Sequence, residues 1–362
     1  MTGRAQRNGR HGRQAIVRRP SGRRLTLIDM TTSHTRRATI RQLAGRTVAA
    51  VLLAGMAACG TSSSHDVTSS SQIDPGPTND TAAPAMPATT IPATPVDKPT
   101  TTSLATRPSA TTDEVVAISG GHLHIRCSGS GATTVVLIAG WNDDHTSFNT
   151  IDTTLTASTR VCSYDKFGTG TSDPALDPQR FSTQATDLHE LLRLANEPGP
   201  YVVVGHSFGG DVAVTFASTF HDEVRGLLLL DATPTTWNSV LCAVPNDGTA
   251  FATGLAGVCA MQAETSNNAE GIEGPSAFAE MDGIASLGSL PLIVDTAADL
   301  GYSDQGASPE LATQLTDAWN AGQQHWVSLS SQGELVEVPD TGHYIHIDQP
   351  GLVVEQVTSL LS

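Results

Sequence analysis

The stretch Tyr201-Val-Val-Val-Gly-His-Ser207-Phe-Gly-Gly210 carries the strongest structural signal in this chain. An apolar run leads into the pattern Gly-x-Ser-x-Gly, and the small, apolar run Phe208–Phe220 follows it. This order indicates a buried strand, a sharp turn and then a helix. The turn needs glycine on both sides of the serine, because the strand and the helix approach each other closely there. Ser207 is therefore the candidate nucleophile.

Apolar runs of strand length recur on both sides of this turn. The predicted strands are Val115–Ile118, His122–Cys127, Thr134–Ala139, Arg160–Tyr164, Tyr201–Gly205, Arg225–Leu230, Leu290–Val294 and Glu334–Val338. The predicted helices are Phe181–Ala195 with Ser182 as its N-cap, Phe208–Phe220, Pro309–Ser330 and Leu352–Leu361. Alternating strands and helices predict an α/β fold with a doubly wound, mostly parallel sheet. Residues 232–289 break this rhythm and are predicted to form a small cap above the carboxyl edge of the sheet.

A serine hydroxyl is a poor nucleophile until a base removes its proton. His343 follows the predicted strand Glu334–Val338 and directly follows Gly342, so it suits a loop aimed at the nucleophile. His346 is the alternative base, although we expect it to begin or pack beside the last helix. His206 is expected to be a packing residue, because its side chain diverges from that of its neighbour Ser207.

The base needs an acid that holds its tautomer, and two strand ends can supply one. Asp231 closes the run RGLLLLD, and Asp299 lies in LIVDTAAD after the next strand. Asp295 and Asp304 are weaker candidates. The sequence leaves Asp231 and Asp299 open, with Asp231 preferred.

The developing oxyanion needs two backbone N–H donors. Phe208, directly after the nucleophile, supplies the first. Trp141 is the candidate for the second, because Gly140 before it lets the backbone approach a substrate. The Trp141 ring can also form an apolar wall of the pocket.

Residues 113–362 resemble the α/β-hydrolase fold superfamily, and exported bacterial esterases in particular. The resemblance rests on four pieces in order: Ala139-Gly140-Trp141, Asp165-Lys-Phe-Gly-Thr-Gly-Thr-Ser172, the turn at Ser207, and Gly342-His343-Tyr-Ile-His-Ile-Asp-Gln-Pro350. It implies an eight-stranded sheet and hydrolysis of a carboxylic ester, an amide or a lactone through an acyl-enzyme. The implied partner is a small-molecule ester, with no cofactor and no metal. Two alternatives stay open: a non-enzymatic binding lipoprotein on this scaffold, and perhydrolase or lyase chemistry.

The N-terminal part has the pattern of an export signal. Thr47–Ala58 is a short apolar run preceded by arginines and followed by Cys59. Twelve residues are too few to span a bilayer, which takes about 20, so we expect residues 30–58 to be a signal peptide. Met56-Ala-Ala-Cys59 resembles a bacterial lipobox, which makes Cys59 the expected lipidation site and the only membrane attachment. Ordinary cleavage near Ala58 is the alternative.

Two further segments have their own composition. Residues 1–29 are rich in arginine and are expected to be an over-extended start, with translation beginning at Met30. Residues 60–112 are rich in Thr, Ser, Pro and Ala, and are expected to form a disordered linker. Together these predictions place the enzyme domain outside the cytoplasm, lipid-anchored or secreted.

Charge and cysteine content narrow the partners and the compartment. The chain carries a formal net charge of −16, although residues 1–58 hold many arginines and one acid, Asp29. The rest is therefore strongly acidic and repels phosphate backbones, which argues against nucleic-acid binding. Besides Cys59, four cysteines permit disulfides in an exported domain. We favour Cys242–Cys259, which leaves Cys127 and Cys162 as a second pair or as buried thiols.

Overall fold

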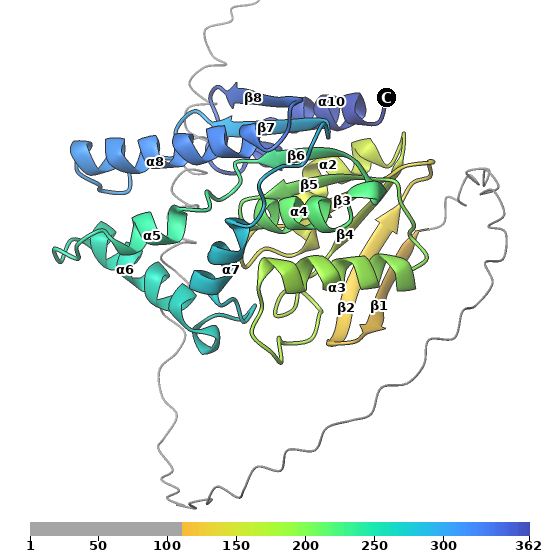
Figure 1. Cartoon of the computed structure of the whole chain (residues 1–362), viewed down its shortest axis with the longest axis horizontal. Coiled ribbons are helices and arrows are strands. Elements are labelled where there is room, and N and C mark those ends of the chain that lie inside the picture. Colours follow the sequence, from red (N-terminus) through yellow and green to blue (C-terminus); the bar gives the residue numbers. More distant parts are fainter. Residues whose placement is uncertain (1–110) are drawn as a thin grey trace, which may run out of the picture. The chain divides into compact units, whose positions relative to one another are not determined.

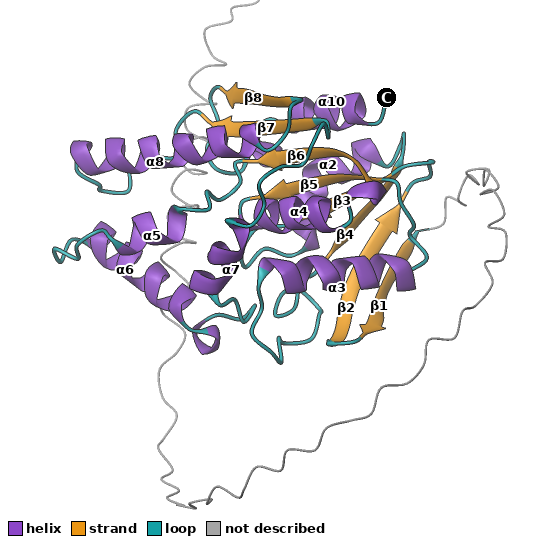
Figure 2. Cartoon of the chain, viewed as in Figure 1, coloured by secondary structure: helices purple, strands orange, loops and turns teal. Residues whose placement is uncertain are grey.

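The computed structural model describes residues 111–362, which form an eight-stranded sheet with helices on both faces (Figures 1 and 2). The strands are β1 (Thr112–Ile118), β2 (Gly121–Ser128), β3 (Thr134–Ile138), β4 (Arg160–Tyr164), β5 (Tyr201–His206), β6 (Val224–Leu230), β7 (Leu292–Ala297) and β8 (Gly333–Val338). Their order across the sheet is β1-β2-β4-β3-β5-β6-β7-β8. Strand β2 pairs antiparallel with β1 and β4, and all other pairs are parallel. The predicted fold class is confirmed.

Helical elements alternate with these strands along the chain. The α-helices are α2 (Asn149–Leu155), α3 (Phe181–Leu194), α4 (Phe208–Thr219), α5 (Trp237–Cys242), α6 (Ala250–Ala263), α7 (Gly274–Met281), α8 (Pro309–Ser328), α9 (Ile345–Asp348) and α10 (Pro350–Leu360). The 3₁₀ turns are η2 (His145–Phe148), η3 (His221–Glu223) and η4 (Thr265–Asn267).

The prediction of Ser182 as the N-cap of α3 is wrong. The N-cap is Arg180, whose backbone N–H donates to the Thr183 hydroxyl. Ser182 instead donates from its N–H and its hydroxyl to the Glu280 carboxylate in α7, at 3.0 and 2.7 Å. The Ser182 side chain therefore makes a tertiary contact with a charged acceptor and does not cap the helix locally.

The core lies on both faces of the sheet, as the continuous apolar runs require. Strands β3, β4 and β5 are buried along their whole length. Helices α2 and α10 contribute to the apolar cluster on one face. Helices α3, α4 and α7 contribute to the cluster on the other face, together with Trp326 of α8. The strands are therefore covered on both sides, which is typical of parallel sheets.

The segment 232–289, which we call the cap segment, contains α5, α6, η4 and α7. In Figure 1 the arrowheads of β5 to β8 point toward the side on which α5, α6 and α7 lie. Trp237 and Leu241 of α5 and Phe251 of α6 pack with Leu315 and Trp319 of α8 in a separate apolar cluster. The carboxyl ends of the strands, where parallel sheets place ligands, therefore face this segment.

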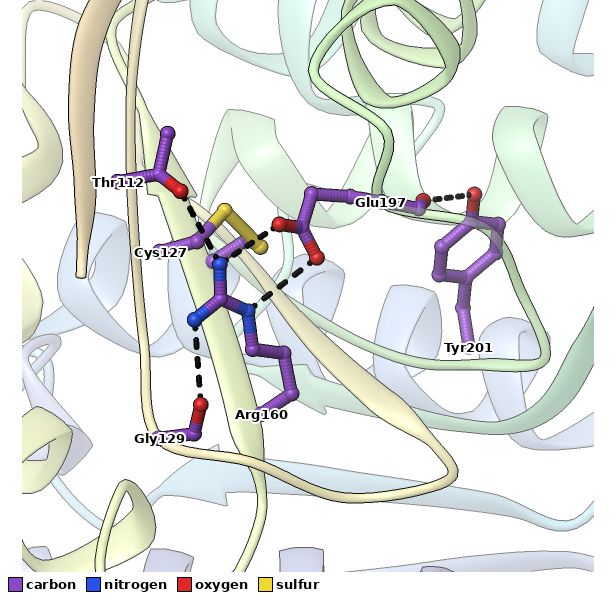
Figure 3. The surroundings of a disulfide bond; sticks show 7 residues. Thr112, Cys127, Gly129, Arg160, Glu197 and Tyr201 are labelled. Atoms are coloured by element: carbon purple, nitrogen blue, oxygen red, sulfur yellow. Dashed lines mark hydrogen bonds and ion pairs between the residues drawn. A yellow bond between two sulfur atoms is a disulfide. The ribbon is translucent and has the colours of Figure 1, made fainter. Parts of the chain in front are cut away.

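Both cysteine pairs form disulfides. Cys242 at the end of α5 is bonded to Cys259 in α6, as favoured from the sequence. Cys127 and Cys162 are directly opposite each other on β2 and β4, and they form the second disulfide (Figure 3). Each bond closes a loop and so restricts the unfolded chain.

The predictions for residues 1–29, the signal at 30–58, lipidation of Cys59 and almost all of the linker at 60–112 lie outside the described residues. Strand β1 begins at Thr112, one residue before the predicted start of the domain. Within residues 111–362, no helix combines the length and the apolar character that crossing a bilayer requires.

Candidate active site

Ser207 lies on a strained turn between β5 and α4. Its backbone has φ 52° and ψ −127°, a conformation that residues with a side chain rarely adopt. A Cβ on Gly205 would lie 2.4 Å from the Gly209 carbonyl oxygen, and one on Gly209 would lie 2.2 Å from the Ile138 carbonyl oxygen. The two glycines therefore allow the contacts that support the turn, and Ser207 is held at the carboxyl end of β5.

Ser207, His343 and Asp231 lie in a hydrogen-bonded row. His343 Nε2 is 2.9 Å from Ser207 Oγ, and His343 Nδ1 is 2.6 Å from Asp231 Oδ2. The Asp231 side chain is fully buried, whereas that of His343 remains 26% exposed. Because a carboxylate only accepts, the Asp231 contact places the proton of a neutral His343 on Nδ1 and leaves Nε2 free to accept the serine proton.

The other candidate acids are turned away from His343. Asp299 is exposed, and its carboxylate accepts from the backbone N–H of Gly301. Asp295 is buried in β7, where its carboxylate accepts from Gln356 Nε2 at 2.7 Å. Asp304 is exposed in the loop after β7. Of the carboxylates considered from the sequence, the structure brings Asp231 to the imidazole.

The two other candidate histidines are buried and have other contacts. His346 lies in α9, where its Nε2 is 3.1 Å from the Ser147 hydroxyl, and burial lowers its pKa to about 3. His206 Nε2 is 3.0 Å from the carbonyl oxygen of His343, so it donates there, and burial lowers the pKa of His206 well below its usual value. Both rings are therefore neutral packing groups, and His206 supports the loop that carries His343.

The two predicted N–H donors lie beside the serine. Phe208 is the first residue of α4, and Gly140 lies against Ser207, since a Cβ on Gly140 would be 3.2 Å from the Ser207 Cβ. Within residues 111–362, neither the Phe208 N–H nor the Trp141 N–H has a protein acceptor. The Trp141 ring stacks on the Phe208 ring with 5.6 Å between centroids. Both N–H groups are thus available for a substrate oxygen.

Asp143 adds a carboxyl group beside the nucleophile. Its Oδ2 is buried without a hydrogen-bond partner and lies 3.9 Å from His206 Nδ1. Burial raises the pKa of Asp143, although Lys166 nearby opposes this effect. Asp143 follows the predicted N–H donor Trp141 by two positions, and no local pattern in the sequence marks it.

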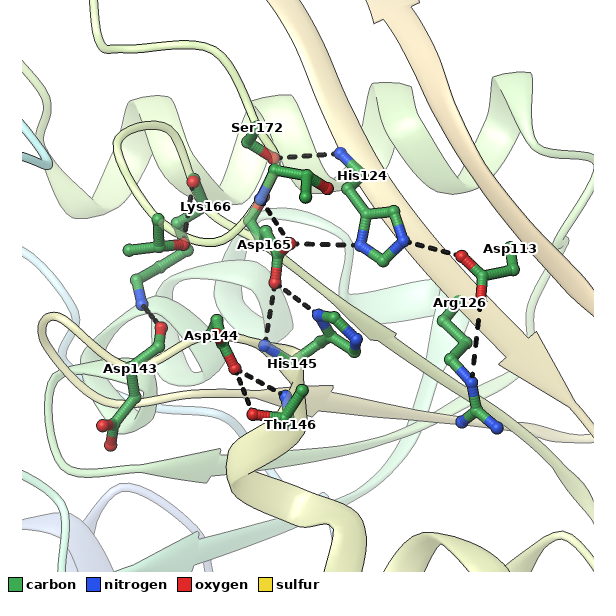
Figure 4. Close-up of polar contacts among 12 residues, drawn as sticks. Asp113, His124, Arg126, Asp143, Asp144, His145, Thr146, Asp165, Lys166 and Ser172 are labelled. Atoms are coloured by element: carbon green, nitrogen blue, oxygen red, sulfur yellow. Dashed lines mark hydrogen bonds and ion pairs between the residues drawn. The ribbon is translucent and has the colours of Figure 1, made fainter.

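One group of side chains has the composition of a cation site. His124, His145 and Asp165 place one ligand atom each within 4.8 Å of one another (Figure 4). His124 lies in β2 and is buried. The Asp165 carboxylate lies 2.7 Å from His145 Nδ1 and 3.1 Å from His124 Nδ1. We interpret the group as a network of polar contacts that fixes the turn after β4.

Two buried side chains near the site had no clear signal in the sequence. Trp319 in α8 donates from Nε1 to Asp231 Oδ1 at 2.8 Å. Lys166, directly after Asp165, contacts backbone carbonyls before η2. An indole in an amphipathic helix normally indicates core packing, and a lysine normally indicates the surface. Their positions in the fold, rather than the local pattern, give them these roles.

Comparisons with known proteins agree with the fold described above. Residues 133–254 match the model of the alpha/beta hydrolase fold family. Among solved structures, an alpha/beta hydrolase of Nostoc sp. PCC 7120 aligns with a TM-score of 0.51 at 16% identity, covering 70% of this chain and 98% of that one. At 16% sequence identity, this structural likeness shows the fold alone. Together these findings support the α/β-hydrolase fold superfamily and an enzyme of the hydrolase class.

Curated relatives match over part of their length. An uncharacterized protein of Schizosaccharomyces pombe is 32% identical over 145 residues, which cover 32% of this chain and 27% of the relative. A soluble epoxide hydrolase of Corynebacterium sp. is 32% identical over 117 residues, covering 32% of this chain and 40% of the relative. The chain therefore spans less than half the length of these two proteins.

Proposed function

We propose that this protein is a serine hydrolase that cleaves a carboxylic ester, with an amide or a lactone as further substrates of the same chemistry. The observation that carries the proposal is the row Asp231–His343–Ser207, with contacts of 2.6 and 2.9 Å on a strained turn. Ser207 is the nucleophile, His343 the general base and Asp231 the acid that orients it. This arrangement is the one that nucleophilic acyl transfer requires.

The first half of the reaction forms an acyl-enzyme. Ser207 Oγ attacks the carbonyl carbon while its proton passes to His343 Nε2. The tetrahedral oxyanion accepts hydrogen bonds from the N–H groups of Phe208 and Trp141. When the carbon–oxygen bond to the leaving group breaks, His343 returns the proton to the departing alcohol.

The second half releases the acid. A water molecule gives a proton to His343 Nε2 and attacks the acyl carbon, and the same two N–H groups again stabilise the oxyanion. Collapse of this intermediate breaks the bond to Ser207 Oγ, which recovers its proton from His343. Asp231 keeps its charge throughout and stabilises the imidazolium in both halves.

The side chain at position 207 favours acyl transfer over epoxide opening, although one relative is named a soluble epoxide hydrolase. A serine oxygen that opened an epoxide would form an ether, which water attacking this site does not cleave. The serine would therefore remain alkylated after one turnover. An acyl group on the same oxygen is an ester, which the His343-activated water removes.

The test uses the full domain with an activity-based probe. We expect a fluorophosphonate to label the protein, and labelling to be lost in Ser207→Ala, which keeps the turn but removes the nucleophile. We also expect turnover of short p-nitrophenyl esters by the native protein and none by the variant. A protein that is folded but neither binds the probe nor hydrolyses any ester of a chain-length series would be a binding protein, and the proposal would be wrong. Turnover of an epoxide without turnover of any ester would contradict the acyl-transfer assignment.

We also propose that the enzyme is exported and lipid-anchored through Cys59. The signal-like segment 30–58 and the two disulfides of the domain support this location, because disulfides persist mainly in oxidising compartments. In a bacterial host, we expect the full chain to fractionate with membranes and to incorporate labelled palmitate. Cys59→Ser should abolish both. Release of the native protein into the medium without label would instead indicate ordinary secretion.

A further inference from the structure

A buried lysine lies beside the loop that carries Trp141. Lys166 Nζ donates to the carbonyl oxygens of Gly140 at 2.7 Å, Ala139 at 3.1 Å and Asp143 at 3.3 Å. The Lys166 side chain is only 3% exposed, and Figure 4 shows it reaching from the turn after β4 toward Asp143. An ammonium group has three donors, so these carbonyls can use all of them. Lys166 therefore fixes the backbone on both sides of Trp141.

The partner of this lysine comes from the cap segment. Glu270 Oε1 lies 3.4 Å from Lys166 Nζ, and it also accepts from the backbone N–H of Asn142 at 2.6 Å. The Glu270 side chain is 1% exposed. Asn142 has φ 63°, in the left-handed region that side chains disfavour. One carboxylate from the cap segment thus holds both the lysine and the strained residue after Trp141.

The backbone that carries Glu270 is itself attached to the sheet domain. A Cβ on Gly168 would lie 1.9 Å from the Ala269 carbonyl oxygen, so the two turns are in direct backbone contact. Gln179 N donates to the Gly271 carbonyl at 2.8 Å, and Gln179 and Ile272 form a parallel bridge. Glu270 is therefore presented from a fixed segment and not from a free lid.

These contacts determine where the Trp141 N–H points. Asp143 N donates to the Gly140 carbonyl at 3.2 Å, which closes a turn across Trp141 and Asn142. Lys166 holds carbonyls at both ends of this turn, and Glu270 holds the Asn142 N–H inside it. Preorganised donors stabilise an oxyanion well because they need no rearrangement during the reaction.

We infer that Lys166 and Glu270 are positioning residues, and that their ion pair lets the cap segment hold the Trp141 half of the oxyanion hole. This inference rests on the proposed function, since it assigns the pair a role in that reaction. Neither side chain touches the reacting atoms. The pair acts through the backbone of residues 139–143.

The test replaces Glu270 by glutamine and compares it with a matched control. Glu270→Gln retains an oxygen that can accept from Asn142 N–H but removes the charge facing Lys166. The control is Glu197→Gln, which breaks another buried ion pair: Arg160 Nη2 lies 2.7 Å from Glu197 Oε1, with side chains 3% and 4% exposed (Figure 3). Removing one partner of a buried pair destabilises a protein in either place. We expect only Glu270→Gln to alter the oxyanion hole.

Two kinetic measurements distinguish positioning from stability. In Glu270→Gln we expect kcat for a short p-nitrophenyl ester to fall at least tenfold, with KM changed less than threefold. We expect the inhibition constant of a boronic acid, which forms a tetrahedral anionic adduct on Ser207, to rise by a similar factor. Glu197→Gln should lower the melting temperature but leave both quantities within about twofold of the native values.

Each outcome bears on the inference. Equal effects of the two variants on kcat, or an unchanged boronate affinity in Glu270→Gln, would overturn it. If Glu270→Gln does not fold, the double variant Lys166→Met/Glu270→Met replaces the pair with apolar groups, which buried pairs often tolerate. A folded double variant with native kcat would also overturn the inference. Failure of the native protein to hydrolyse any ester would contradict the proposed function itself, which is a separate result.

Discussion

Trp319 Nε1 donates a hydrogen bond of 2.8 Å to Asp231 Oδ1, so α8 supports the carboxylate that orients His343. The backbone N–H of Ala297 donates to the same oxygen at 3.1 Å, and Asp231 Oδ2 is left for His343 Nδ1. The buried charge is therefore satisfied from two elements, and its orientation depends on both. The geometry of the proposed triad thus depends on Trp319, which lies more than 80 positions from Asp231 in the chain.

Trp319→Phe should lower kcat about tenfold at nearly unchanged KM. The variant keeps an aromatic ring but loses a hydrogen bond to a buried carboxylate, a contact worth about 1.5–3 kcal/mol. Steady-state kinetics with a p-nitrophenyl ester measures the effect. The control is Trp237→Phe, because Trp237 packs edge-on against Trp319 with 4.8 Å between ring centroids. Equal losses in both variants would indicate a packing effect and contradict the role of the indole N–H.

Asp231→Asn should reduce kcat by at least a hundredfold while the protein stays folded. The amide can turn an N–H toward His343 Nδ1, which favours the tautomer with its proton on Nε2 and blocks proton transfer from Ser207. Asp299→Asn should leave kcat within twofold, because its carboxylate is exposed and bonded to Gly301. Circular dichroism checks the fold of both. A collapse of turnover in Asp299→Asn alone would reverse the assignment of the acid.

The strands and the serine turn could be predicted because their signals are local. Continuous apolar runs marked the strands buried on both faces, and the glycines around Ser207 marked the turn. His343 could be predicted for the same reason, since a glycine-histidine loop follows the last strand. In each case the residues that determine the structure are adjacent in the sequence.

Two features of the site depend on contacts between distant segments. One is the choice of the aspartate that contacts His343, and the other is the support of the backbone of residues 139–143. Asp231 and Asp299 both follow strands. Which of the two carboxylates faces His343 depends on the backbone conformation of the loop after each strand. Glu270 lies in an irregular segment without periodicity, more than 100 residues from Asn142. Ser182 illustrates the same limit on a smaller scale, because a carboxylate from α7 displaced it from capping α3.

Stability should fall as pH rises from about 4 to 7 because of Asp295. Burial raises the pKa of this carboxyl to about 7, from 3.8, and the nearby Asp231 charge adds to the effect. Between these values Asp295 is protonated in the folded protein and ionised in the unfolded chain, so folding takes up a proton. The contribution is most favourable below pH 3.8, declines by up to about 1.4 kcal/mol per pH unit in the window, and is constant above pH 7.

Asp295→Asn should flatten this dependence, and urea unfolding at several pH values measures it. The quantity to compare is the slope of the unfolding free energy with pH. The amide also alters the hydrogen bond with Gln356, but this shifts the unfolding free energy by the same amount at every pH. Asp299→Asn, at an exposed position of the same segment, serves as the control and should keep the native slope. An unchanged slope in Asp295→Asn would show that the buried carboxyl does not titrate in this window.

Gly209→Ala should destabilise the protein and reduce turnover at least tenfold. The added Cβ would lie 2.2 Å from the Ile138 carbonyl oxygen and 2.6 Å from that of Ala139. Ile138 ends β3 and Ala139 follows it, so both oxygens belong to the backbone. Relieving these clashes therefore requires α4 to move away from the sheet. Overpacking of this kind costs about 1–3 kcal/mol, and the movement would displace the Phe208 N–H from the oxyanion.

Gly351→Ala in α10 is the matched control, because a Cβ there meets no atom within 4 Å. Thermal melting and ester hydrolysis of both variants test the idea, and a Gly209→Ala protein with native melting temperature and native kcat would contradict the close approach of α4 to β3.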